Sequence, residues 1–240
     1  MSVQTTPSTK ITGIDLVGTA VRNLDRALAY YRDALGLVLA NHNDDGAEFH
    51  FPDGSTYGLY QPPAGSPVEP GFAVFFHDEG EILNALKTPV CIMSSGQDPE
   101  GNRIILHRKH AADPHTPPQQ RQTATTIKGI DLAGYLVEDV EKELAYYRAL
   151  GIAPTEIDPE GRGAEFELAD GQTFGIWRTP EAQRAGFVMF AVDDANAKVA
   201  ELKAKGVPMS DPLETPGCIM AFGPDPEGTM VIIHQRKGHG

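Results

Sequence analysis

Hydrophobic and polar positions at the start of the chain alternate as in a strand, and then change to a helical spacing. Asn23 is placed to cap this helix, and Gly36 to end it. Short alternating runs follow, with a hairpin turn at Asp53-Gly54. The strands expected on this pattern span residues 11–21, 37–40, 47–51, 56–60, 72–76, 90–94 and 103–107, and the helices residues 24–35 and 79–86. The pattern predicts one βαβββ unit followed by an abbreviated second unit.

The same order of motifs occurs twice along the chain. ITGIDLVGTAVRNLDRALAYYRDALGL starts at residue 11, and IKGIDLAGYLVEDVEKELAYYRALGI starts at residue 127. Later motifs repeat in the same order, with GAEF at Gly46 and Gly163, a TPxCIM segment at Thr88 and Thr215, and DPEG at Asp98 and Asp225. Such self-similarity indicates two copies of one module. The predicted organisation is a tail over residues 1–10, module one over 11–108, a linker rich in Pro, Gln and Thr over 109–126, and module two over 127–236.

The two copies differ in the length of one segment. Fifteen residues lie between Phe72 and Thr88, whereas 27 lie between Phe187 and Thr215. Module one therefore lacks about 12 residues, enough to remove the end of a helix and one edge strand. This predicts a truncated or more open sheet in module one, and two cavities that are not equivalent.

The paired I-x-G-I-D starts, the Y-Y-R helices and the DPEG turns resemble the vicinal oxygen chelate superfamily. That superfamily includes glyoxalases, extradiol dioxygenases, fosfomycin-modifying enzymes and bleomycin-resistance proteins. The resemblance implies an α+β fold of two tandem modules, each made of paired βαβββ units that form a curved mixed sheet with helices on the convex face. It also implies that the modules pack as an internal pseudo-dimer, and pairing of whole chains into a homodimer is left open.

Metal-dependent members of this superfamily carry imidazole and carboxylate ligands at four positions of a module. By the resemblance these positions hold Leu16, Gly58, Phe72 and Ile105 in module one, and Leu132, Gly175, Phe187 and Ile232 in module two. None of these side chains has a lone pair for a divalent ion. Neither a metal nor another cofactor is therefore expected, and glyoxalase or ring-cleaving dioxygenase chemistry is not supported.

Strand alternation adds one aromatic residue to each of these sets. Tyr60 should share a face with Gly58, and Trp177 with Gly175. The predicted ligand-binding residues are Leu16, Gly58, Tyr60, Phe72 and Ile105 in module one, and Leu132, Gly175, Trp177, Phe187 and Ile232 in module two. An apolar groove with an aromatic wall suits a planar organic ligand. The alternative is that these side chains fill the sheet interior as a packed core.

Polar candidates for catalysis are few. His107 and His234 lie two residues beyond the apolar Ile105 and Ile232 and should face the same side, whereas His50 lies on a middle strand. Each is a weak candidate for a catalytic base, and a structural role is favoured over a catalytic one for each. Cys91 and Cys218 occupy matching positions and are expected to be buried free thiols rather than a disulfide.

Net charge and hydropathy restrict the partners. The chain has 20 Lys and Arg against 33 Asp and Glu, a formal charge of −13, so neither nucleic acid nor an anionic membrane is an expected partner. A neutral or cationic small molecule would be tolerated. The first ten residues have no apolar signal core, and no apolar run approaches the roughly 18 residues of a membrane span. A cytoplasmic, soluble protein is therefore expected.

Three hypotheses for function remain. The first is a metal-independent binder of the bleomycin-resistance type, which sequesters an aromatic or hydrophobic natural product or antibiotic. The second is a cofactor-free isomerase, cyclase or lyase that uses a pocket histidine as general base. The third is a degenerate module that serves as a scaffold.

Overall fold

The computed structural model describes residues 10–68, 71–79, 85–88, 91–109, 126–178 and 185–237. Module one consists of β1 (Lys10–Ala20), α1 (Leu24–Leu28), η1 (Ala29–Ala34), β2 (Leu39–Asn43), β3 (Gly46–His50), β4 (Thr56–Tyr60), β5 (Phe72–Glu79), β6 (Leu86–Lys87), β7 (Cys91–Gln97) and β8 (Arg103–Lys109). Module two consists of β9 (Ile127–Val137), α2 (Val140–Ala149), β10 (Glu156–Ile157), β11 (Gly163–Glu167), β12 (Thr173–Arg178), β13 (Ala185–Val192), α3 (Ala195–Ala204), β14 (Leu213–Glu214), β15 (Cys218–Pro224) and β16 (Met230–Arg236). The predicted tail and linker fall, apart from their ends, outside the described residues.

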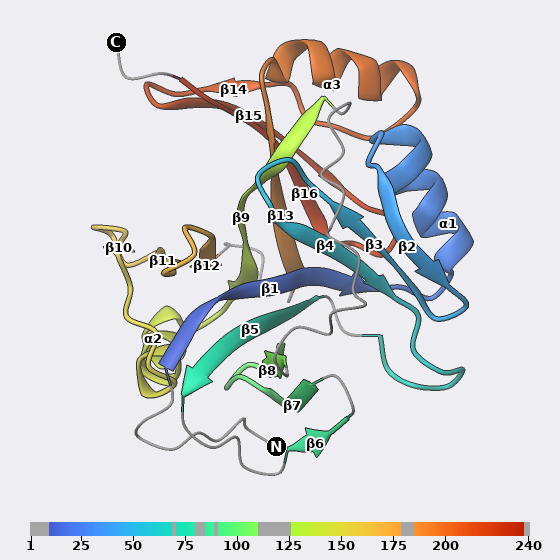
Figure 1. The fold of residues 1–240 in the computed structure, drawn as a ribbon. Coiled ribbons are helices and arrows are strands. Elements are labelled where there is room, and N and C mark those ends of the chain that lie inside the picture. Colours follow the sequence, from blue (N-terminus) through green and yellow to red (C-terminus); the bar gives the residue numbers. More distant parts are fainter. Residues whose placement is uncertain are drawn as a thin grey trace.

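Each module forms one mixed sheet, and the two sheets have the same strand order (Figure 1). In module one the order is β2-β3-β4-β1-β5-β8-β7-β6, and in module two β10-β11-β12-β9-β13-β16-β15-β14. Within each βαβββ unit the first and last strands pair in parallel, and an antiparallel pair joins the two units. The expected fold, two tandem modules of paired βαβββ units, is confirmed.

The predicted loss of an edge strand from module one is wrong. The described residues form eight strands in each sheet, and the short strand β6 pairs with β7 just as β14 pairs with β15. A two-residue edge strand needs only backbone partners, so the shorter connection can still supply it. The helix expected over residues 79–86 falls largely outside the described residues, which place Glu79 in β5 and Leu86 in β6.

One hydrophobic core unites the two modules. Alternate strand residues such as Phe49 and Phe75 of module one and Phe166 and Phe190 of module two are fully buried in the same cluster as the helix residues. The rings of Phe75 and Phe174 meet edge to face across the modules, with centroids 5.2 Å apart. Each sheet therefore turns one face to a shared core and leaves the opposite face available for a site.

A one-residue difference between the copies explains the unusual first helix. YYRDALGL of module one is one residue longer than YYRALGI of module two. Module one accommodates the extra residue as the π-helical segment η1, where the Leu35 N–H donates to the Tyr30 carbonyl five residues back. In module two the Leu150 N–H donates to the Tyr146 carbonyl, which gives the ordinary α-helical spacing.

The tyrosines of the repeated Y-Y-R motif connect the modules. The Tyr31 hydroxyl donates to Asp225 of the second DPEG turn at 2.7 Å, and the Tyr147 hydroxyl donates to Asp98 of the first at 3.3 Å. Both tyrosines are fully buried. Burial raises the pKa of the Asp225 carboxyl. Hydrogen bonds from Tyr31 and from backbone N–H groups partly offset this rise. The second tyrosine of each Y-Y-R motif therefore makes a hydrogen bond to the opposite module.

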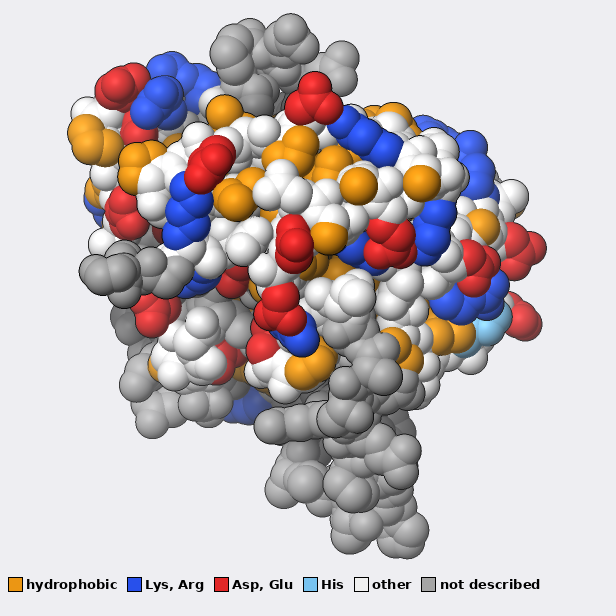
Figure 2. Space-filling model, turned by 90° about the horizontal axis from the view of Figure 1, so that it is seen from above, with side chains coloured by type: hydrophobic (Ala, Val, Ile, Leu, Met, Phe, Trp, Pro, Cys, Tyr) orange, Lys and Arg blue, Asp and Glu red, His pale blue; other side chains and the backbone are white. Residues whose placement is uncertain are grey.

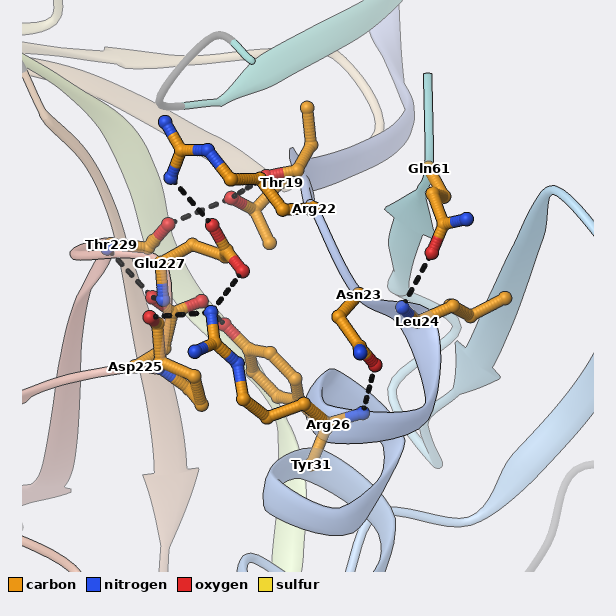
Figure 3. A network of polar contacts seen from close by, with 12 residues as sticks. Thr19, Arg22, Asn23, Leu24, Arg26, Tyr31, Gln61, Asp225, Glu227 and Thr229 are labelled. Carbon is orange, nitrogen blue, oxygen red and sulfur yellow. Dashed lines mark hydrogen bonds and ion pairs between the residues drawn. The ribbon is translucent and has the colours of Figure 1, made fainter. Parts of the chain in front are cut away.

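The glutamates of the DPEG turns also cross to the other module, but with different partners. Glu227 accepts from Arg22 at 3.0 Å and from Arg26 at 2.5 Å (Figure 3). Glu100 instead accepts from backbone N–H groups at the start of α2, including that of its N-cap Asp139 at 2.7 Å. A carboxylate at a helix N-terminus is stabilised by those N–H groups and by the helix dipole.

The glycine of each I-x-G-I-D motif makes room for the hairpin turn of the opposite module. Asp170 accepts from the Ile14 N–H at 2.9 Å, and Asp53 accepts from the Ile130 N–H at 3.2 Å. A Cβ at Gly13 would collide with the Asp170 carboxylate. The repeated glycine is thus required for packing between the modules.

Glu143 is a point at which the two modules differ in the interface between them. It is fully buried on α2, at the position that Ala27 occupies on α1. Burial, and then the nearby Asp98 and Glu100 carboxylates, raise the pKa of Glu143 to about 9. Its carboxyl group is therefore protonated at neutral pH.

Surface charges of both signs are interspersed on the face that Figure 2 shows. Ion pairs near α3 include Lys203 with Asp211 and Lys205 with Glu201. Within the described ranges, no helix is long and apolar enough to cross a membrane. Cys91 and Cys218 are free thiols, the first buried and the second half-buried.

Candidate functional site

Module one holds a cavity of about 850 Å³ on the sheet face opposite the shared core. Strand alternation sends Leu16, Phe72 and Ile105 to this face, while their neighbours Val17, Ala73 and Ile104 are buried in the core. All five residues predicted for module one, Leu16, Gly58, Tyr60, Phe72 and Ile105, line this cavity. Their role as ligand contacts remains a prediction.

Glycine forms part of the cavity floor. Gly58 on β4 pairs with Gly18 on the adjacent strand β1. A Cβ at Gly58 would lie 3.1 Å from the side-chain methyl groups of Leu16, and one at Gly18 would collide with the Gly58 carbonyl. Tyr60 stands at the edge, with 46% of its surface exposed. The Leu16 side chain therefore lies over Gly58, and the floor is apolar with an aromatic residue at its rim, which suits a planar molecule.

Two pairs of interacting polar side chains lie on the cavity wall. His107 Nδ1 lies 2.7 Å from Asp15 Oδ2, and the His107 ring stacks on Phe76 with centroids 6.0 Å apart. On the other side, Asn41 Nδ2 donates to Glu48 at 2.9 Å. Because Asp15 holds one imidazole nitrogen, the geometry can present the other as a base or a hydrogen-bond partner.

Module two fills the corresponding face with larger side chains. Leu132, Phe187 and Ile232 are at most 7% exposed and form a separate hydrophobic cluster. Six partly buried side chains pack against this cluster: Leu136, Trp177, Met189, Met220, Phe222 and Met230. A Cβ at Gly175 would meet Leu132, Trp177 and Phe187 within 3.4 Å, so these groups converge above it. The residues predicted for a groove in module two therefore lie together as a packed cluster.

Four replacements distinguish the two faces. Matching the repeats by strand register pairs Ala20 with Leu136, Val74 with Met189, Ser95 with Phe222, and Arg103 with Met230. Each exchange places a larger or more apolar side chain in module two, and all four members from module one line its cavity. Smaller or more polar side chains at these four positions therefore accompany the open face of module one.

The three candidate histidines have different surroundings. His107 lines the cavity, whereas His50 lies outside the lining, with its Nε2 3.6 Å from Glu48. His234 Nδ1 lies 2.6 Å from Asp131, the counterpart of Asp15. The same His–Asp pair thus occurs in both modules, including the one with the filled face. This repetition favours a role in holding strands together.

The positions that bind metal in the superfamily do not fit a metal here. Leu16, Gly58, Phe72 and Ile105 converge on one cavity, but none offers a donor atom. The described residues contain no group of three or more His, Cys, Asp or Glu side chains placed to hold a metal ion.

The fold is similar to those of solved dioxygenase and glyoxalase structures. A homoprotocatechuate 2,3-dioxygenase variant from Brevibacterium fuscum aligns with all of this chain and 76% of its own, at a TM-score of 0.67 and 14% identity. The corresponding dioxygenase from Arthrobacter globiformis gives a TM-score of 0.67 at 15% identity, covering 98% of this chain and 84% of its own. The Mn(II)-bound glyoxalase from Novosphingobium aromaticivorans gives 0.66 at 16% identity, covering 95% and 83%.

This chain accordingly has the vicinal oxygen chelate fold, as its motifs predict. No family model matches the chain. No curated protein sequence matches it at a significant level.

Sequence reasoning did not select several cavity residues. Asp15 is the aspartate of the first I-x-G-I-D motif, and the repetition of this motif could have marked it. Its partner His107, however, lies 92 residues away in sequence. Ser95 and Arg103 could have been found by aligning the two repeats, since each differs strongly from its partner, Phe222 or Met230. Asn41 has no such signal.

Proposed function

We propose that the chain is a metal-independent binder of a small aromatic or hydrophobic molecule, such as a natural product or antibiotic, and that module one holds the ligand. The single observation that supports this is the cavity of about 850 Å³ lined by Leu16, Gly58, Tyr60, Phe72 and Ile105. Its size falls within the range of small-molecule sites, roughly 300–1,000 Å³. Burial of the ligand against these side chains and stacking on Tyr60 or Phe72 supply the affinity.

The first experiment is a calorimetric titration of the chain with a panel of planar aromatic natural products and antibiotics. Mass spectrometry then identifies the compound recovered from the complex. The expected result is saturable binding by one site per chain, release of the compound unchanged, and loss of binding in Ser95→Phe. Binding that Ser95→Phe does not weaken would contradict a module-one site, and conversion of the compound would contradict sequestration.

A cofactor-free enzyme is the second candidate, because His107 lines the cavity and is oriented by Asp15 at 2.7 Å. In this mechanism the free imidazole nitrogen of His107 removes a proton from the bound substrate. The presence of the same pair in module two, as His234 and Asp131, weighs against it. Turnover that His107→Gln abolishes while ligand affinity is kept would favour the enzyme over the binder.

A further inference from the structure

His107 holds one ring nitrogen against Asp15 and leaves the other without a partner beside the cavity. Nδ1 lies 2.7 Å from Asp15 Oδ2, and the residue lines the cavity although it is only 7% exposed. Within the described residues, Nε2 has no hydrogen-bond partner. Unlike the Tyr30 hydroxyl, which is sealed in the interior without a partner, Nε2 keeps some accessible surface. A molecule in the cavity can therefore reach this nitrogen.

The Asp15 carboxylate determines which nitrogen carries the hydrogen. A carboxylate can only accept hydrogen bonds, so Nδ1 is the N–H of the neutral ring. Nε2 then carries the lone pair, and a ligand group that reaches it must supply an O–H or N–H. The ring of Phe76 stacks on that of His107, with centroids 6.0 Å and planes 15° apart, and holds the imidazole in this orientation.

The side chains around Nε2 favour a neutral donor over a charged one. Phe76 and Met93 flank His107 in one row across the sheet, and Ile105 lies two residues before it on β8. These side chains are apolar, and Asp15 is already engaged with His107. A hydroxyl has one hydrogen to donate, which Nε2 satisfies, whereas an ammonium group has three and would need two further acceptors here.

Module two repeats the His–Asp pair in different surroundings. Asp131 holds His234 Nδ1 at 2.6 Å, but Ala191 stands where module one has Phe76, so the stacked ring is replaced by a methyl group. On the same strand, Met189 replaces Val74 and packs onto the filled cluster. The chain thus contains its own comparison, the same pair beside a filled face.

Resting on the proposed function, we infer that His107 Nε2 determines ligand specificity in module one, and that the ligand is an aromatic molecule with a neutral hydroxyl or N–H that donates to it. The pair with Asp15 links β1 to β8, and it also fixes the direction of the hydrogen bond to the ligand. A ligand with only an acceptor at this point is disfavoured, because two lone pairs would face each other.

Three naphthalenes of similar size test this inference by equilibrium dialysis. They are 2-naphthol, which can donate a hydrogen bond, 2-methoxynaphthalene, which can only accept one, and 2-methylnaphthalene, which does neither. Each is dialysed against the unchanged chain, His107→Phe and Ser95→Phe. His234→Phe removes the same nitrogen from the module-two pair and is the matched control.

The unchanged chain should bind 2-naphthol about threefold to tenfold more tightly than the other two probes, the factor that one neutral hydrogen bond contributes. His107→Phe should remove this preference and leave the Kd of 2-methylnaphthalene within about twofold. His234→Phe should leave all three Kd values within about twofold. In nitrogen NMR spectra of the unchanged chain, 2-naphthol but not 2-methylnaphthalene should shift the Nε2 signal of His107.

Equal affinities of the three probes for the unchanged chain, or a preference for 2-naphthol that His107→Phe leaves intact, would overturn the inference. If Ser95→Phe still abolished binding of all three in that case, the proposed function would stand without it. Binding that Ser95→Phe does not weaken, or no binding of any probe, would contradict the module-one site itself. Circular dichroism shows whether each variant is folded. If His107→Phe is not, the NMR shift in the unchanged chain, assigned with His107→Gln, decides.

Discussion

The two modules share a strand order and a His–Asp pair, yet their sheet faces opposite the shared core are filled to different extents. Module one surrounds a cavity of about 850 Å³, whereas module two packs Leu132, Phe187 and Ile232 beneath methionine and aromatic side chains. The fold therefore does not by itself provide a ligand site. Whether a copy is open depends on the volume of a few side chains that converge from different strands.

The largest effect on ligand affinity is expected when module one is given side chains of module two. In Ser95→Phe combined with Ala20→Leu, the new side chains occupy the space of the ligand. Losing about 100 Å² of apolar ligand contact costs about 2.5 kcal/mol, a rise in Kd of about 60-fold. Calorimetric titration measures the affinity for an aromatic ligand. Ser95 is exposed to the cavity but Ala20 is buried, so circular dichroism first establishes that the double variant is folded.

Phe222→Ser, the reverse exchange in module two, is the control for that experiment. It should leave the Kd of the module-one site unchanged while it lowers the free energy of unfolding. If this variant removed binding and Ser95→Phe did not, the assignment of the open and filled faces would be reversed.

The second prediction concerns Glu143, which module one replaces with Ala27. Its pKa is about 9 in the folded chain against an ordinary value of 4.5, so between these pH values the folded state holds a proton that the unfolded state has lost. This contribution to stability is fully present below about pH 4.5 and is lost as pH rises through 9. Between pH 5 and 8 the free energy of unfolding should fall by on the order of 3 kcal/mol.

Denaturant titrations at several pH values test this slope. Glu143→Gln should flatten it, while Glu141→Gln, at an exposed position of the same helix, should not. A smaller slope of the same sign should persist, because burial also raises the pKa of Asp98 and Asp225. An unchanged slope in Glu143→Gln would show that this carboxyl is already ionised at neutral pH.

The third prediction compares the two His–Asp pairs. If both serve to hold strands, His107→Gln and His234→Gln should lower the free energy of unfolding by similar amounts, about 1–3 kcal/mol each. Thermal and denaturant unfolding of the two variants make the comparison. A His107 variant that keeps its stability but loses turnover of a bound compound would point to a catalytic rather than a structural pair.

The smallest effect is expected from deleting Asp33, which makes the module-one motif as short as that of module two. The π-helical segment should become a regular α-helix, with a change in stability within about 1 kcal/mol. Deleting Ala149 from the already regular α2 is the matched control and should cost more. Thermal unfolding tests both. Equal losses would mean that the extra residue of η1 is required where it stands.

Much of this architecture can be read from the sequence alone. The duplicated motifs predict two modules of paired βαβββ units, and the Leu16, Phe72 and Ile105 positions are predicted to meet on one face. The modules follow from strand periodicity and from spacings preserved in both copies, which are local properties of the chain, whereas the shared face follows from the resemblance to the vicinal oxygen chelate superfamily. The lost edge strand was predicted wrongly because segment length does not show whether two residues can still pair with a neighbouring strand.

Tertiary structure alone decided which face is open and how the modules are joined. The cavity depends on side chains brought from β1, β5, β7 and β8, so its volume is a property of their packing together and not of any one stretch. The hydrogen bond from Tyr31 to Asp225 spans 194 residues of sequence, and no local pattern specifies such a partner. The repeats and the alternation of strand faces are determined by local sequence. The module-one cavity, in contrast, exists because side chains from strands distant in sequence leave a space unfilled.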